Sequence, residues 1–203
     1  MRHTKPVDDP ATKSEPPLAG DPEWLAEWPL AGGPPVRFRH VRPDDEPFVT
    51  EAIRTASRET LLHRFFSPIR SVSPSQLRGM LAIDRTNETC IVGVVTTQDI
   101  TRLICGARYV RLPQPHAAEI ALTVHDDFQR RGLGGFLLQL LARRAAADGI
   151  RWFEADVMNS NRNMLNLFTK LAPDHTRTRR MGDVTHLVFE VSNVAQPDEM
   201  GRS

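Results

Sequence analysis

The chain has little of what marks a secreted, membrane-spanning or metal-binding protein. It has two cysteines in 203 residues, a formal net charge of +1 and a charged, proline-rich N-terminus where a signal peptide would have an apolar core. No apolar run reaches the roughly 18 residues that span a bilayer. We therefore expect a soluble, cytoplasmic protein that binds no membrane and no metal ion. Without a strong positive charge, nucleic acid is not an expected partner either.

Thiols and phenols are equally scarce. Cys90 and Cys105 lie in predicted strands, where we expect reduced, buried thiols, although two neighbouring strands could in principle pair them. Tyr109 is the only tyrosine and also lies in a predicted strand. We expect it to be structural, which leaves few side chains of this kind for proton transfer.

Composition divides the chain into an arm, one domain and a tail. Residues 1–35 are crowded with proline, glycine and charge, so we expect a flexible N-terminal arm. Within it, residues 22–30 carry two tryptophans and two leucines, which should dock on the domain or on a partner. Regular patterning covers residues 36–192, and residues 193–203 are expected to form a disordered tail.

The hydrophobic periodicity of residues 36–192 predicts an α/β (α+β) domain. Strands are predicted at 36–42, 89–97, 102–112, 117–124, 152–158, 178–181 and 184–191. Helices are predicted to begin near residues 43–46 and to cover 57–66, 73–81, about 131–148 and 161–171. Ser57 is a plausible N-cap, and Gly182-Asp183 is a plausible hairpin turn.

The most informative segment leads from the strand at 117–124 through a glycine-rich turn into a helix. The first amides of a helix lack internal partners and carry partial positive charge, so they attract anions. Gly132, Gly134 and Gly135 allow close approach to the main chain, and Arg130 and Arg131 add charge. A diphosphate would fit best; the alternative is an ordinary turn with two solvated arginines.

Two other phosphate-binding motifs do not match this segment. Leu137 occupies the last glycine position of a dinucleotide fingerprint, and no Gly-Lys-Ser/Thr follows as in a Walker loop. The sequence Gln129-Arg130-Arg131-Gly132-Leu133-Gly134 instead resembles the acetyl-CoA pyrophosphate loop of the GNAT superfamily of N-acetyltransferases. This resemblance implies the GNAT fold, in which helices flank a mixed, mostly antiparallel twisted sheet with splayed central strands.

The resemblance also implies how acetyl-CoA would bind. Its diphosphate would contact Gln129, Arg130, Arg131, Gly132, Leu133, Gly134 and Gly135. Its pantetheine arm would pair with the main chain of Leu122, Thr123 and Val124, although these residues could equally form a simple buried strand. Asn161 would hold the arm through its amide, or would serve only as a helix cap.

Glu119 is the predicted catalytic base. A lysine amine has a pKa of about 10.4 and must lose a proton before it attacks a thioester. Glu119 stands in an otherwise apolar strand, where partial burial would make it a better base; it could instead be a strand-end carboxylate paired with Arg or Lys. An amide near Leu122 or Thr123 would polarise the thioester oxygen.

One departure from the family pattern concerns the general acid. Phe168 stands where many GNAT enzymes have a tyrosine that protonates the departing CoA thiolate. Water or another group must then supply that proton. His116 and His125 flank the strand of Glu119, but isolated histidines at strand ends are more often surface residues.

The segments 57–66 and 126–129, together with Glu119, look like the catalytic domain of bacterial protein lysine acetyltransferases of the Pat type. The resemblance implies a protein lysine as acceptor, with residues 57–81 shaping its groove. A small-molecule amine N-acetyltransferase is one alternative, and a non-catalytic acyl-CoA-binding sensor is another. The arginines of 177–180 are expected to be solvated, and the oligomeric state stays open.

Overall fold

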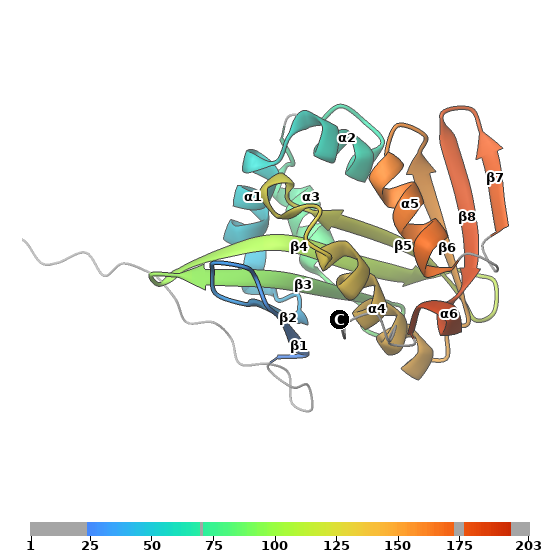
Figure 1. The fold of residues 1–203 in the computed structure, drawn as a ribbon, viewed down its shortest axis with the longest axis horizontal. Coiled ribbons are helices and arrows are strands. Elements are labelled where there is room, and N and C mark those ends of the chain that lie inside the picture. The colour runs from blue at the N-terminus through green and yellow to red at the C-terminus, as the bar shows by residue number, and fades with distance from the viewer. Residues whose placement is uncertain (1–23, 70, 173–176, 196–203) are drawn as a thin grey trace, which may run out of the picture.

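The structure is a computed structural model that describes residues 24–69, 71–172 and 177–195. Its described residues form one eight-stranded sheet in the order β1-β2-β3-β4-β5-β6-β8-β7. The β5–β6 pair is parallel, and the other strand pairs are antiparallel. Helices cover the sheet on both sides (Figure 1), so the predicted fold class, a mixed and mostly antiparallel sheet flanked by helices, is confirmed.

Apart from β1, η2 and α6, which were not predicted, the elements follow the predicted order with small shifts at their ends. The strands are β1 (Ala26–Trp28), β2 (Val36–His40), β3 (Glu88–Thr97), β4 (Ile100–Arg111), β5 (Ala117–Val124), β6 (Trp152–Met158), β7 (Arg177–Met181) and β8 (Val184–Glu190). The helices are η1 (Pro43–Asp45), α1 (Glu46–Thr55), α2 (Arg58–Phe65), α3 (Pro74–Leu81), η2 (Asp126–Phe128), α4 (Leu133–Ala147), α5 (Arg162–Leu171) and α6 (Val191–Ala195).

Polar residues fix the start of three helices. The hydroxyl of Ser57 accepts a hydrogen bond from the Thr60 amide, and Ser73 forms a capping box with Gln76. The side-chain oxygen of Asn161 accepts from the Met164 amide, 3.2 Å away. These bonds satisfy amides that the first helical turn leaves without partners, which explains why the sequence located these helix starts closely.

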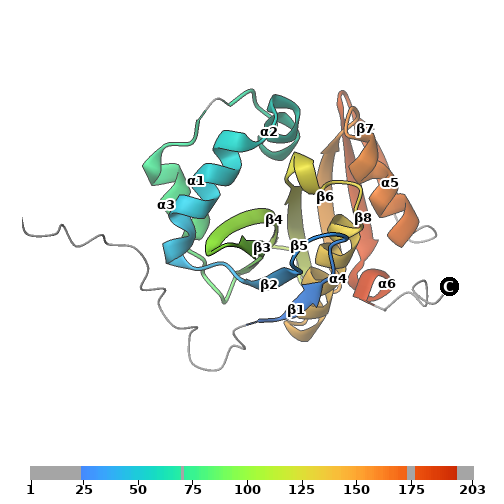
Figure 2. The same cartoon turned by 60° about the vertical axis from the view of Figure 1, so that its left-hand side comes forward.

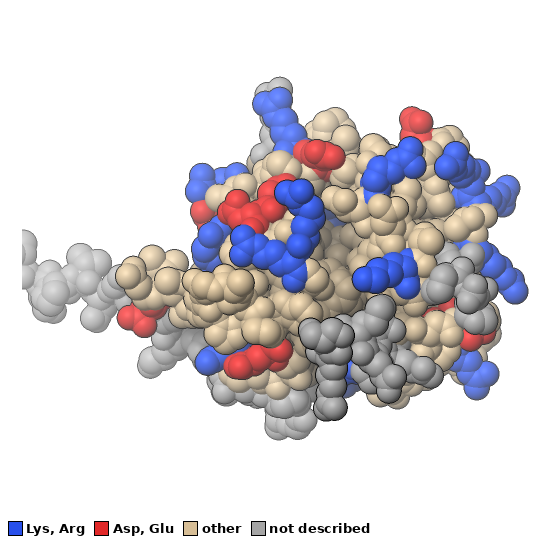
Figure 3. All heavy atoms as spheres, viewed as in Figure 1, with Lys and Arg blue, Asp and Glu red and all other residues tan. Residues whose placement is uncertain are grey.

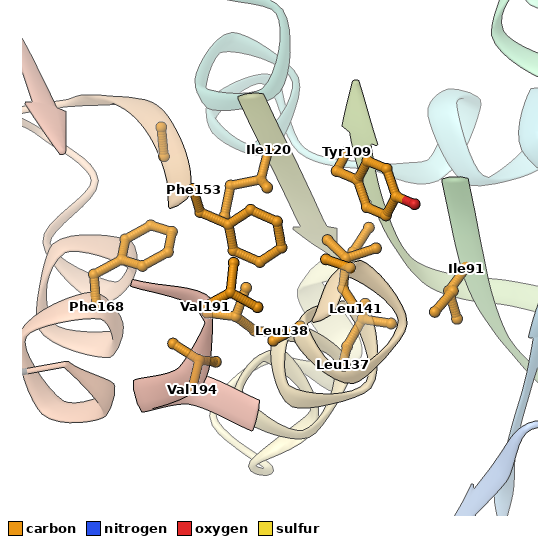
Figure 4. Close-up of a cluster of buried hydrophobic side chains, with 14 of the residues drawn as sticks. Ile91, Tyr109, Ile120, Leu137, Leu138, Leu141, Phe153, Phe168, Val191 and Val194 are labelled. Carbon is orange, nitrogen blue, oxygen red and sulfur yellow. The ribbon is translucent and has the colours of Figure 1, made fainter. Parts of the chain in front are cut away.

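The two faces of the sheet carry different helices (Figure 2). α1, α2 and α3 lie on one side, and α4 and α6 lie on the other. α4 presents Leu137, Leu138 and Leu141 to the main core, where each is fully buried. Figure 4 shows these leucines in one cluster with Phe153 of β6. Burial of such side chains, at about 1.5–3 kcal/mol each, holds α4 against the sheet.

Both ends of the domain differ from the predicted boundaries. β1 pairs with β2, and Trp28 packs on Phe136 with ring centroids 4.8 Å apart, so the apolar part of the predicted arm does dock on the domain. At the other end, residues 193–195 belong to α6, although the tail was predicted to begin at 193. Val194 is 1% exposed there, because it packs into the main core. Residues 1–23 and 196–203 lie outside the described residues.

The two cysteines are free thiols in the structure. Cys105 is buried and Cys90 is half-buried, so the expected burial holds fully for Cys105 and in part for Cys90. Burial raises the pKa of Cys105 to about 12 and that of Cys90 to about 11. Neither thiol is therefore a good nucleophile near neutral pH.

β5 and β6 separate after a short paired stretch, as the predicted splay requires. Their parallel pairing covers Ala117–Glu119 on β5 and Trp152–Glu154 on β6. Both strands continue beyond this point, to Val124 and Met158 respectively. The second half of β5 therefore keeps its partner β4 on one side but has no strand partner on the other.

Candidate functional site

A groove of about 600 Å³ begins at the opening between β5 and β6 and reaches the start of α4. Figure 3 shows this face hollowed between groups of lysine and arginine side chains. The volume lies within the range of about 300–1,000 Å³ that is typical of small-molecule sites. Its lining includes most of the predicted cofactor residues: Leu122, Thr123, Val124, Gln129, Arg130, Gly132, Gly134, Gly135 and Asn161.

Two predicted cofactor residues do not line the groove. The side chain of Leu133 is 1% exposed, because it is the first residue of α4 to point into the core. Arg131 is exposed, and its guanidinium carbon lies 5.5 Å from the centroid of the Phe128 ring. Neither side chain reaches the groove, so the predicted contact of Leu133 depends on its amide, which belongs to the first turn of α4.

The main chain of β5 presents alternate residues to the opening. The His125 amide donates to the Ile104 carbonyl of β4 at 2.8 Å. This bond determines which residues of β5 direct their peptide groups toward β4 and which direct them away from it. Because hydrogen bonding alternates along an antiparallel pair, the peptide groups of Leu122 and Val124 face the opening and those of Thr123 face β4. Of the two predicted amide donors, Leu122 has the right direction and Thr123 does not.

The start of α4 forms the far end of the groove. Gly132 is the N-cap with φ at +81°, and no side chain caps the helix. The amides of the first turn are therefore available to an anion, as the sequence predicts. Arg130 also has a positive φ, at +58°, so the turn before the helix is strongly bent. The bend brings Arg130 to the groove, while Arg131 is directed away.

A hydrogen-bond network ties α2 to this turn. The carboxylate of Asp126 accepts from the Ser57 amide at 2.8 Å and from the hydroxyls of Ser57 and Thr60, both at 2.7 Å. Burial raises the pKa of Asp126, but these hydrogen bonds outweigh it and hold the pKa below its usual value. The Gln129 side chain donates to Thr60 Oγ1 at 3.3 Å and to the Val124 carbonyl at 3.0 Å. Gln129 therefore lines the groove and also links α2 to the end of β5.

Glu119 lies in a smaller pocket of about 140 Å³ beside the groove. The two share Leu122, Asn161 and three further lining residues: His63, Arg64 and Met164. Glu119 makes no hydrogen bond or ion pair with any described residue, so the alternative of a paired strand-end carboxylate is not found. Its side chain is exposed and not partly buried, because the strand face that carries it opens at this pocket.

Arg64 of α2 lies where the groove and the pocket of Glu119 meet. Its side chain is half-buried, and burial lowers its pKa. Arg64 makes no ion pair with any described residue; its guanidinium carbon lies 5.3 Å from the Phe65 ring centroid. Glu119 is near enough for the two charges to interact. No sequence signal separates Arg64 from the other arginines of residues 57–81.

Phe168 and Tyr109, which bear on the missing general acid, both pack as structural residues. Phe168 lines the pocket, is 3% exposed and packs on Phe189 with ring centroids 5.1 Å apart. The Tyr109 hydroxyl is buried in the core, where it donates to Asp148 and accepts from Thr89 at 3.2 Å. The predicted structural role of Tyr109 is consistent with these contacts.

The two histidines at the ends of β5 differ from each other. His116 is exposed, and its Nδ1 lies 2.9 Å from the Gly149 carbonyl. His125 is 7% exposed, with its Nε2 3.0 Å from the Thr55 hydroxyl. His125 is therefore not the surface residue that its strand-end position suggests, because α1 covers it.

Two further classes of site are not found in the described part of the chain. No group of three or more His, Cys, Asp or Glu residues there is placed to hold a metal ion. None of the described helices has both the length and the apolar character that a membrane span needs.

Residues 44–172 match the acetyltransferase (GNAT) family. Acetyltransferase Pat of Mycolicibacterium smegmatis is 33% identical over 137 residues, which are 66% of this chain but only 40% of that protein. The GNAT domain of S. lividans PAT is a structural neighbour with a TM-score of 0.72 and 25% identity, covering 87% of this chain and 99% of that one. The yncA structure from Salmonella typhimurium, which contains acetyl-CoA, has a TM-score of 0.61 at 18% identity, covering 81% and 98%.

Proposed function

Because the chain belongs to the acetyltransferase (GNAT) family, we propose that it transfers an acetyl group from acetyl-CoA to an amine, namely the ε-amine of a protein lysine. One observation carries this proposal. A single groove joins the open edge of β5 to the uncapped start of α4, and the pocket of Glu119 opens beside it. An elongated ligand with a diphosphate at one end and a reactive group at the other fits that arrangement.

The lining of the groove fits coenzyme A at both ends. The first-turn amides of α4 and Arg130 would hold the diphosphate, since both supply positive charge to an anion. The main chain of Leu122 would pair with the pantetheine arm in the manner of an added strand. The yncA structure with acetyl-CoA and a RimL structure with CoA, both similar in fold, support this choice of cofactor.

The chemistry assigns one step to each group. Acetyl-CoA supplies the activated acetyl group. Glu119, directly or through water, takes a proton from the acceptor ammonium, and the neutral nitrogen then bonds to the thioester carbonyl carbon. The Leu122 amide faces the opening and would stabilise the negative oxygen that forms. As the carbon–sulfur bond breaks, the nitrogen would lose its second proton to water, and the departing thiolate would take a proton from water because Phe168 has none to give.

The pocket of Glu119 supports a lysine acceptor. Phe66, which is 44% exposed, and Asp156, whose carboxylate lies 2.8 Å from His186 Nδ1, line it together with Glu119. An aromatic ring and two carboxylates suit a cation on an aliphatic stem. The similarity to the two proteins named Pat adds to this support. A free amine of similar charge would satisfy the same groups, so small-molecule acetylation is the first alternative.

The acceptor can be identified by measuring CoA release with a panel of lysine peptides and small amines. Mass spectrometry of candidate proteins from the same reactions would locate the acetyl group. Our proposal predicts turnover with lysine peptides and a mass increase on lysine. Turnover with small amines alone would establish the first alternative.

A sensor that binds acyl-CoA without catalysis is the second alternative. Phe168 favours it, because the tyrosine that many GNAT enzymes use is missing. Saturable binding of acetyl-CoA without turnover on any acceptor in the panel would establish that role.

A further inference from the structure

A second cavity lies on the other side of Arg64 from the pocket of Glu119. It has a volume of about 130 Å³ and lies between α1, α2 and the sheet face of β3, β4 and β5. Apolar side chains dominate its lining, among them Val49, Ile53, Leu61, Phe65, Leu103 and Ile104. The proposed acetyl transfer does not use this space.

The cavity borders the proposed cofactor groove. Thr60, Arg64 and Thr123 border both spaces. Thr123 follows Leu122, the residue whose amide faces the thioester end of the groove in the proposed function. A group attached to the thioester carbonyl would therefore enter the cavity past Thr123.

Thr123 also indicates that a ligand completes this region. Its hydroxyl oxygen is buried and has no hydrogen-bond partner among the described residues. A buried hydroxyl without a partner is costly, so natural proteins rarely keep one unless a ligand or water satisfies it. A thioester carbonyl at the mouth of the cavity would accept that hydrogen bond.

The charged residues around the cavity do not suit a lysine ammonium in its interior, and they provide no binding site for an anion there. None of the described residues that line it is Asp or Glu. Arg108 contributes to the lining but is paired with Glu88. Arg64, which has no ion-pair partner, lies at the mouth that the cavity shares with the groove. The interior therefore suits an uncharged, apolar chain.

We propose that this cavity holds the acyl chain of acyl-CoA substrates longer than acetyl-CoA, up to four to six carbons. A cavity of ~150 Å³ lined by Leu, Ile and Phe is known to hold a six-carbon ring, so the size is adequate. The inference rests on the proposed function, because it places the thioester at Leu122. It adds the substrate class: linear, uncharged acyl groups.

Titration calorimetry with CoA, acetyl-CoA, butyryl-CoA, hexanoyl-CoA and succinyl-CoA tests this inference without an acceptor. Each added methylene should tighten binding up to ~4-fold, as burial of about 0.8 kcal/mol per CH₂ implies, until the cavity is full. Succinyl-CoA should bind more weakly than butyryl-CoA, because its carboxylate would enter apolar space. Equal affinity for CoA, acetyl-CoA and butyryl-CoA would overturn the acyl site while leaving the proposed function intact. Failure of CoA itself to bind would overturn both.

Two cavity variants sharpen the test. Ala52→Leu adds bulk from α1 into the cavity and should remove the preference for butyryl-CoA and hexanoyl-CoA while acetyl-CoA still binds. Ile53→Ala enlarges the cavity and should shift the optimum toward hexanoyl-CoA. Ala146→Leu makes the first change at an exposed position of α4 and should have no effect on the acyl preference. An unchanged chain-length profile in both cavity variants would contradict the assignment.

Discussion

The indole ring of Trp28 lies directly behind Gly132, the N-cap of α4, so that a Cβ added to Gly132 would lie 2.8 Å from Trp28 Cζ2. Gly132 also has φ at +81°, a conformation that L side chains rarely adopt. β1 places Trp28 there, and the ring packs on Phe136 one turn into α4. The docked segment of the arm therefore supports the turn that we propose for the diphosphate.

Gly132→Ala should weaken acetyl-CoA binding, because the turn must move away from Trp28 and lose its alignment with the groove. We expect at least a 10-fold higher Kd, together with the cost of about 1–2 kcal/mol that a left-handed residue with a Cβ carries. Calorimetry and thermal unfolding measure the two effects separately.

Gly149→Ala is the matched control for this change. Gly149 also has a positive φ, at +77°, but an added Cβ would meet nothing within 4 Å. This variant should lose stability and keep its acetyl-CoA affinity. Equal loss of affinity in both variants would show that backbone strain, and not the contact with Trp28, is responsible.

Glu119→Gln should lower kcat by about 10²–10⁴-fold at neutral pH, the range typical of a lost general base, and leave acetyl-CoA affinity within a few-fold. The side chain keeps its size but can no longer take the proton. Glu190→Gln, on β8 and outside the pocket, controls for loss of one negative charge. Unchanged turnover of Glu119→Gln would remove Glu119 from the mechanism.

Asp45→Ala should destabilise the fold by about 3–5 kcal/mol, as removal of one partner from a buried ion pair usually does. Asp45 forms a bidentate pair with Arg39 at 2.6 and 2.7 Å, with side chains only 1% and 7% exposed. Urea unfolding measures the loss. Glu51→Ala, which breaks an exposed pair with Arg54, should have little effect. A small effect of Asp45→Ala would mean that the buried pair contributes little net stability.

Asp126 should make stability depend on pH in the acid range. Its hydrogen bonds hold its pKa in the folded protein below the usual 3.8, so the unfolded chain takes up the proton first as pH falls. The stabilisation is therefore complete above that value and is lost as pH falls through the lower folded pKa. Urea unfolding at pH 5 and pH 3 should show a smaller decrease for Asp126→Asn than for the unaltered protein. Parallel decreases in both proteins would contradict this role.

Local sequence signals predicted the fold well where they act within one element. The alternation of β5 and β6 and the caps Ser57, Ser73 and Asn161 need only neighbouring residues, and the predicted bounds of β5 and β6 match the structure. β1 was not predicted as a strand, because three residues are too few for a pattern and depend on pairing with β2.

The candidate site shows the same limit. The motif at 129–135 located the turn, but only the bend at Arg130 and the phase of α4 determine that Arg131 and Leu133 leave the groove. The amide of Leu122, and not that of Thr123, faces the opening because of the hydrogen bond between His125 and Ile104, which joins two different strands. The position of Arg64 depends on how α2 packs over β5. A pattern of neighbouring residues cannot predict this packing, because the two elements are far apart in the sequence.

Titration calorimetry with CoA and with pantetheine measures whether the uncapped start of α4 holds the diphosphate of coenzyme A. Pantetheine keeps the arm that would pair with β5 but lacks the diphosphate and the adenosine 3'-phosphate that the diphosphate carries. We expect saturable binding of CoA, tighter than that of pantetheine by about 10- to 100-fold, as a few charge-assisted hydrogen bonds imply. Equal affinity for the two compounds, or no binding of CoA to the folded protein, would contradict it.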